Sequence, residues 1–180
     1  MTLSCIVCDS VEYENLYPAI VKCKKCGYIY AVLDLSQKDY EQLYNSRYFN
    51  GEEYSDYISD KVILQKNFTA RLTTLKTIID PDVHKSLLEV GSAYGFFLDV
   101  AKNDFLEVTG VDVFEDGVNY SRDKLKLDAY VADLLTWDFN NKHYDVVCMW
   151  DTIEHLKSPQ LYIKKISKKR RTTFAFKRLR

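Results

Sequence analysis

One stretch of the sequence decides the fold: Leu87-Leu88-Glu89-Val90-Gly91-Ser92-Ala93-Tyr94-Gly95-Phe96-Phe97-Leu98. An apolar run ends in an acid, breaks at Gly91 and Gly95, and resumes with helical spacing, so it predicts a strand, a tight turn and a helix. Because glycine has no Cβ, the backbone can turn sharply here, and the following helix offers unpaired N–H groups to a ligand. Such a turn is typical of nucleotide-binding sites, and a glycine turn without a ligand is the structural alternative.

The segments after this turn continue as an α/β domain. We expect strands at residues 107–112, 129–133 and 144–151 and a helix at residues 116–125. Acids stand at the carboxyl ends of the four predicted strands, where ligands bind in doubly wound folds; they are Glu89, Asp112, Asp133 and Asp151. The pattern therefore predicts an incomplete doubly wound, Rossmann-like parallel sheet of about four to five strands.

Two C-x-x-C pairs stand near the N-terminus, Cys5 with Cys8 and Cys23 with Cys26. A two-residue spacer lets a tight turn direct both sulfurs at one ion, so two such turns complete a tetrahedral four-cysteine zinc site. Four cysteines leave no open coordination position, which predicts a structural Zn²⁺. Disulfides are the alternative, but they are rare in the reducing environment of the cytoplasm, where we expect this protein.

Three domains follow from these patterns. Residues 1–35 are expected to form a small zinc ribbon, residues 36–80 a helical linker or lid, and residues 81–180 the partial Rossmann-like domain. The linker carries an aromatic patch, for which a substrate wall and packing between the domains are both open; its residues are Tyr44, Tyr48, Phe49, Tyr54 and Tyr57.

Composition and charge narrow the class of protein. The chain has 180 residues, 47% of them hydrophobic, and is long enough to bury a core. Its formal charge of -1 hides a basic stretch at residues 164–180, which holds nine basic residues and no acid. Neither a secretory signal nor a bilayer-spanning apolar run is visible, so we expect a cytoplasmic protein without a membrane partner.

The stretch from Glu89 to Gly95 resembles the acid-x-Gly-x-Gly-x-Gly motif of class I S-adenosylmethionine-dependent methyltransferases, with Ala93 in place of the middle glycine. Residues 87–157 resemble that family at each expected motif, and the whole chain is similar to a bacterial subgroup with an N-terminal zinc ribbon. Alanine at 93 and phenylalanine at 96 break the dinucleotide fingerprint, which disfavours an NAD-dependent enzyme.

The resemblance implies S-adenosyl-L-methionine as cofactor and ten residues that bind it: Glu89, Gly91, Ala93, Gly95, Asp112, Val113, Asp133, Leu134, Trp150 and Asp151. Glu89 would face the methionine amino group, and the three turn residues would pass beneath the amino-acid and ribose part. Asp112 would hold the ribose hydroxyls, with Val113 near the adenine. Asp133 would accept from the adenine amino group, the Leu134 N–H would donate to the ring, and the last two residues would close the pocket.

One candidate catalytic residue comes from the same resemblance. The segment 150–156 resembles the Glu-His motif that follows strand four in many small-molecule methyltransferases. His155 would act there as a base or orient the acceptor. The alternative is that His155 lies at the start of a helix and only packs against its neighbours.

The resemblance also implies seven strands, whereas this chain ends after about four. A helix at residues 158–168 and one more short strand at residues 172–176 are expected. The abrupt change to basic residues from Lys168 onward is compatible with a truncated or frameshifted gene product. An uncovered fourth strand would be an apolar edge through which another chain could pair. The oligomeric state is not readable from the sequence.

The sequence is therefore compatible with two functions. The first is methylation of a small molecule or glycan precursor. The second is a catalytically inactive, methyltransferase-like binding or scaffold module that acts through the ribbon and the basic tail. Nucleic-acid binding by the tail is disfavoured, because a run of charges is more often a solvated end.

Overall fold

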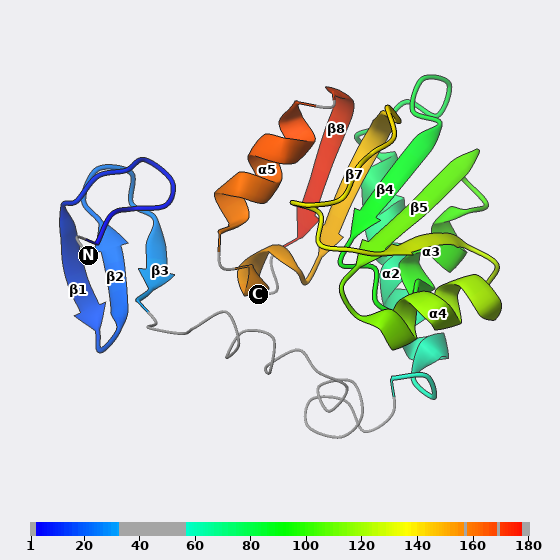
Figure 1. The fold of residues 1–180 in the computed structure, drawn as a ribbon, viewed down its shortest axis with the longest axis horizontal. Helices are drawn as coiled ribbons and strands as arrows, with labels where there is room; N and C mark the ends of the chain where they lie inside the picture. Colours follow the sequence, from blue (N-terminus) through cyan, green and yellow to red (C-terminus); the bar gives the residue numbers. More distant parts are fainter. Residues whose placement is uncertain (1–2, 33–56, 157, 169, 178–180) are drawn as a thin grey trace. The chain divides into compact units, whose positions relative to one another are not determined.

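The computed structural model describes residues 3–32, 57–156, 158–168 and 170–177 (Figure 1). The chain divides into two compact units, Met1–Leu43 and Tyr44–Arg180. The first part of the predicted helical linker, residues 36–56, and the aromatic residues at 44, 48, 49 and 54 lie outside the described residues.

The first unit is a small antiparallel sheet in the order β1-β2-β3. Its strands are β1 (Tyr13–Tyr17), β2 (Ile20–Cys23) and β3 (Ile29–Ala31). These three short strands lie within the region that was expected to form a zinc ribbon. Every residue of β1 is exposed, and the buried hydrophobic residues in this unit's described part are Cys5, Val21 and Cys23. Two of these three are cysteines, so this unit has little apolar core of its own.

The second unit contains a sheet whose five strands all run parallel, in the order β6-β5-β4-β7-β8. The strands are β4 (Ser86–Val90), β5 (Glu107–Asp112), β6 (Asp128–Val131), β7 (Tyr144–Trp150) and β8 (Arg170–Lys177). The predicted Rossmann-like parallel sheet is confirmed. β8, drawn in red in Figure 1, is longer than the strand expected at residues 172–176 and pairs along β7. The apolar β7 is therefore an interior strand and not the sheet edge.

Helices cover both faces of this sheet. They are α2 (Lys61–Lys76), α3 (Phe96–Ala101), α4 (Glu115–Asp123), the 3₁₀ turn η2 (Ile153–His155) and α5 (Pro159–Ser167). Successive strand residues point to opposite faces. In β4, Leu87 packs in the core formed with α2 and α3, whereas Leu88 packs in the core that contains Ile166 of α5.

The core beneath α2 explains where that helix lies. Leu72 and Leu75 of α2 are buried in the same cluster as Phe97 of α3 and Trp150 of β7. Residues of α2 are thereby brought close to the carboxyl ends of the strands. Within the described residues, no helix has the length and apolar character needed to cross a membrane.

Candidate functional site

A cavity of about 220 Å³ opens at the carboxyl ends of β4, β5, β6 and β7. The chain leaves β4 into α3 on one face of the sheet and leaves β7 toward α5 on the other, so the two connections diverge and leave a crevice. Such a switch point is where open α/β sheets bind ligands. His155 and nine of the ten residues expected to bind the cofactor line this cavity; the exception is Gly95.

The turn after β4 depends on two glycines. Gly91 has φ +78°, and a Cβ there would lie 2.2 Å from Thr152 Oγ1, so glycine lets the segment after β7 pack against the turn. Gly95 has φ +72° at the start of α3, and a Cβ there would lie 2.5 Å from Ser121 Oγ. Ala93 keeps a left-handed φ of +43° without being glycine. Gly91 thus shapes the cavity wall, and Gly95 packs the turn onto the neighbouring helix.

The Asp112 carboxylate joins the turns after β4 and β5. Its Oδ2 accepts from the Ala93 N–H at 2.7 Å, and its Oδ1 accepts from the Phe114 N–H at 2.8 Å. Burial raises the pKa of Asp112, and the backbone N–H donors oppose that shift. A carboxylate oxygen accepts more than one hydrogen bond, so Asp112 retains acceptor capacity toward the cavity.

Asp133 follows β6 and is held on one side. Its Oδ1 accepts from the Leu135 N–H at 2.8 Å and from the Tyr162 hydroxyl of α5 at 2.9 Å. Leu134 is buried on the cavity wall, and Val113 is 63% exposed at its rim. The wall between β5 and β6 therefore combines acidic groups with apolar surface.

Glu89 lies deeper than the other acids, on β4 opposite Gly110 of β5 and Cys148 of β7. It is only 2% exposed, and no described residue hydrogen-bonds to its Oε2. Burial raises the pKa of Glu89 well above its usual value; the charge of Asp112 adds to this, and that of Arg71 opposes it. The Oε2 atom can therefore accept a ligand at the cavity, and a ligand ammonium group would favour the ionised carboxylate.

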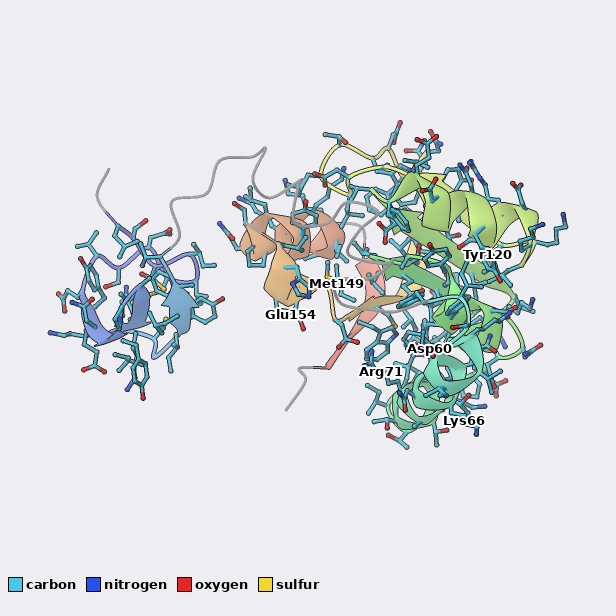
Figure 2. All side chains as sticks on the ribbon, turned by 90° about the horizontal axis from the view of Figure 1, so that it is seen from below. Asp60, Lys66, Arg71, Tyr120, Met149 and Glu154 are labelled. Atoms are coloured by element: carbon cyan, nitrogen blue, oxygen red, sulfur yellow. The ribbon has the colours of Figure 1, made fainter. Side chains whose placement is uncertain are left out.

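Arg71 projects from α2 toward the end of β7 (Figure 2). Its Nη2 lies 2.7 Å from Asp151 Oδ2, and the guanidinium group lies 5.3 Å from the Phe68 ring centroid and 5.5 Å from that of Trp150. Asp151 has a left-handed φ of +51°. The ion pair and the ring contacts fix the residues that end β7.

Four buried polar atoms of Arg71 and of residues at the ends of β4 and β7 have no hydrogen-bond partner among the described residues. They are Glu89 Oε2, Asp151 Oδ1, Arg71 Nη1 and Trp150 Nε1. Two are acceptors and two are donors. Unpaired buried polar atoms cost about 1–3 kcal/mol each, and a ligand with both an ammonium and a carboxylate group can satisfy both kinds. Three of these residues, Glu89, Trp150 and Asp151, line the cavity, so this part of it suits a ligand that carries both charges.

His155 lies on the cavity wall as part of η2. Its backbone N–H donates to the Thr152 carbonyl at 3.0 Å. Aromatic rings form the wall next to the turn, where Tyr57 stacks on Phe96 with 5.5 Å between centroids. Tyr57 is the member of the predicted aromatic patch that the structure describes. It stands at the cavity, as a substrate wall requires, and also packs on the core aromatic cluster.

Three residues of the site were missed by sequence reasoning: Arg71, Thr152 and Tyr162. A signal exists for Arg71, which stands three residues after Phe68 and four before Leu75, on the apolar side of the predicted helix. Tyr162 had none, because its partner Asp133 is 29 residues away and is reached through the folded sheet.

The four cysteines of the first unit converge on one point. Their sulfurs all lie within 4.8 Å of one another, with 3.6 Å between Cys5 and Cys26 and between Cys8 and Cys23. A disulfide needs about 2.05 Å, whereas a tetrahedral ion with bonds of about 2.3 Å places its sulfurs roughly 3.8 Å apart. The spacing therefore fits a four-coordinate zinc ion.

In the second cysteine pair the backbone favours a thiolate at Cys23, whereas the pKa of Cys26 is raised by burial and by the neighbouring thiols. N–H groups of Cys26 and then Lys25 hydrogen-bond to the Cys23 sulfur and lower the pKa of that thiol to about 6. Gly27 adopts φ +75° directly after the pair, as expected for this turn. Thiolates are the form in which cysteine binds zinc.

A family model described as a methyltransferase domain matches residues 63–172. That segment contains the glycine turn, the four acids and the Arg71 and Tyr162 side chains. No curated protein matches the chain in sequence.

Solved structures share the fold at low sequence identity. An S-adenosylmethionine-dependent methyltransferase from Clostridium acetobutylicum ATCC 824 has TM-score 0.54 at 15% identity over 67% of this chain and 54% of its own. The plantazolicin methyltransferase BpumL, in complex with SAH, has 0.54 at 17% over 76% and 58%. The N-methyltransferase NodS from Bradyrhizobium japonicum WM9, also with SAH, has 0.52 at 15% over 73% and 66%. The chain thus spans between about half and two thirds of the length of these structures.

Proposed function

We propose a function for this chain, which belongs to the class I methyltransferase family. It binds S-adenosylmethionine at the strand ends and methylates a small molecule or glycan precursor. One observation carries the proposal: nine of the ten residues that the family motifs assign to the cofactor line a single cavity at the switch point of the sheet. The glycine turn, the acids and the segment after β7 reach it from separate parts of the sequence.

The cofactor-binding residues divide by the part of the cofactor that they suit. Glu89, Asp151 and Arg71 surround the unpaired polar atoms that fit the ammonium and carboxylate groups. Asp112, held by two backbone N–H groups, accepts from ribose hydroxyls. Asp133 and the Leu134 N–H read the adenine ring. These assignments place the reacting end of the cofactor toward the turn after β7.

The bound cofactor supplies a methyl group activated by a positive sulfur. The chain's own residues have to hold the acceptor in line with that group and remove a proton where the acceptor carries one. His155 lies on the wall of the same cavity and is the candidate for the second task. Tyr57 and Phe68 supply an aromatic surface against which an acceptor can pack.

A transfer assay tests this function. The full chain is incubated with S-adenosylmethionine labelled in its methyl group and with pools of small hydroxylated or amino compounds and glycan precursors. We expect label in at least one acceptor, and His155→Ala to lower the rate about 10²-fold or more. If the folded chain binds the cofactor product but methylates no member of any pool, the inactive binding module becomes the better account.

Zinc has a separate role in the proposal. We infer that Cys5, Cys8, Cys23 and Cys26 hold one structural Zn²⁺, because the four sulfurs surround a point at distances that suit it and leave no open position. Metal analysis of the purified chain should give one zinc per chain. Loss of that zinc from Cys23→Ser, with zinc retained in Cys148→Ala, would assign the metal to the first unit.

A further inference from the structure

We propose that Tyr162 is a positioning residue that makes the cavity selective for adenine: its hydroxyl fixes the Asp133 carboxylate so that the free oxygen faces the base as an acceptor. The inference rests on the proposed function, because it assumes that the cofactor's base lies against Asp133. It adds a residue of α5 that no family motif identified.

The geometry begins with Asp133 Oδ1. This oxygen accepts two hydrogen bonds, from the Leu135 N–H at 2.8 Å and from the Tyr162 hydroxyl at 2.9 Å. One donor comes from the segment after β6 and the other from α5, and Asp133 and Tyr162 both line the cavity. Two donors from different directions set the plane of the carboxylate.

The other oxygen, Oδ2, accepts no hydrogen bond from the described parts of the chain. With Oδ1 held, the remaining lone pairs belong to an oxygen whose position is fixed. Burial first, and then the hydrogen bond to Asp133, raise the pKa of Tyr162, so its hydroxyl keeps its proton and stays a donor. The pair Tyr162–Asp133 therefore presents an acceptor and not a donor to the cavity.

An oriented acceptor distinguishes purine bases. Adenine carries an exocyclic amino group, a donor, whereas hypoxanthine carries a carbonyl oxygen, an acceptor, at the same ring position. A carboxylate that cannot rotate away pairs with the first and repels the second. A site built to pair with a donor rejects the analogue that lacks it more strongly than an apolar pocket does.

The test compares S-adenosylhomocysteine with S-inosylhomocysteine, its deaminated analogue, by calorimetric titration of the full zinc-loaded chain. We expect the wild type to prefer the adenosyl compound by about 100-fold or more. Tyr162→Phe keeps the ring but loses the hydroxyl, and should reduce that preference about tenfold. Tyr144→Phe is the matched control, because Tyr144 stands at the opposite end of β7 from the cavity and should leave the preference unchanged.

A second variant tests orientation directly. In Asp133→Asn, the amide oxygen takes the place of Oδ1 and accepts from Tyr162 and Leu135, so the amide NH₂ group faces the base. This variant should shift the preference toward the inosyl compound. Adding Tyr162→Phe should reduce that shift about tenfold, because one of the two donors that fix the amide is lost.

The outcomes separate the two proposals. A wild type that binds neither compound overturns the cofactor assignment and this inference together. A wild type that binds both equally leaves the cofactor site standing and overturns the inference. Unchanged preference in a folded Tyr162→Phe chain also overturns it, and if that variant does not fold, a failure of Asp133→Asn to shift preference toward the inosyl compound does the same.

Discussion

The two proposed ligand sites of this chain are built in opposite ways. Among residues 3–32 of the first unit, two of the three buried hydrophobic residues are the cysteines Cys5 and Cys23, so the proposed zinc site is also the core. In the second unit, separate apolar clusters pack on each face of the sheet, and the cavity lies beyond the strand ends. The comparison shows that a ligand can hold a fold together or can occupy a site that the fold already holds open. Removing each ligand, or its binding groups, should therefore have different consequences.

Zinc removal should give the largest effect. Structural zinc contributes of order 10 kcal/mol to such small units, so a strong chelator should unfold the first unit. The second unit should keep its structure, because its core contains none of these four cysteines. Residue-specific NMR signals of Tyr13, Tyr17, Tyr28 and Tyr30 report the first unit, and tryptophan fluorescence from Trp137 and Trp150 reports the second. Simultaneous loss of both signals would contradict the division.

A change in the glycine turn should act on the second unit alone. In Gly91→Ala, the new Cβ would lie 2.2 Å from Thr152 Oγ1 at a φ of +78°. We expect a loss of about 2–4 kcal/mol in the free energy of unfolding of this unit and loss of cofactor binding. Urea denaturation measures the first and calorimetry the second.

Two further variants control that result. Thr152→Gly in the Gly91→Ala background should recover part of the stability, since it removes the clash but not the backbone strain. Ala93→Gly should change stability by less than about 1 kcal/mol, because relief of the left-handed strain at φ +43° is offset by the entropy of glycine. A large effect of Ala93→Gly would show that this side chain packs in a way essential to the turn.

Loss of Arg71 should separate binding from folding. Arg71→Met removes the partner of Asp151, which is about one-third exposed, so we expect a cost of about 1–2 kcal/mol in stability. Affinity for S-adenosylhomocysteine should fall more than tenfold, because a charged hydrogen-bonding group is lost beside the unpaired atoms. Lys66→Met is the matched control on the exposed side of the same helix (Figure 2). Equal affinity of both variants for S-adenosylhomocysteine would show that Arg71 does not contribute to binding.

The pH dependence should be the smallest effect and distinguishes Glu89 from the other acids. Its raised pKa means that the folded chain holds a proton that the unfolded chain has released, so stability falls as pH rises between the unfolded and folded pKa values. Affinity for a ligand ammonium should rise over the same range, by at most tenfold per pH unit, because the carboxylate is the form that binds it. Glu89→Gln should remove the contribution of Glu89 to both slopes. Slopes that are unchanged in that variant would assign them to another group, such as Asp112, whose pKa is also raised by burial.

Local patterns predicted much of this structure. The run at 87–90, its glycine turn and the apolar strand at 144–150 are set by residues adjacent in sequence, and β4, β7 and β5 lie where the pattern placed them. The spacing of the cysteines likewise predicted the convergence of their sulfurs. Glu89 and Asp112 line one cavity because strand ends in a parallel sheet share one edge.

Contacts between distant segments escaped prediction. β6 ends at Val131, before the predicted Asp133, because Asp133 turns its carboxylate back onto the Leu135 N–H. β8 begins and ends beyond its apolar run, because pairing with β7 continues through residues of any type. Arg71 and Tyr162 act through Asp151 and Asp133, partners that only the folded sheet brings near.

The most direct test of the central claim is a calorimetric titration of the zinc-loaded, 180-residue chain with S-adenosylhomocysteine, with NAD as control. We predict micromolar binding of the first compound, no binding of NAD, and a loss of about 1–3 kcal/mol in binding free energy in Asp112→Ala. A folded chain that does not bind S-adenosylhomocysteine, or that binds it unchanged in Asp112→Ala, would contradict the assignment of this cavity to the cofactor.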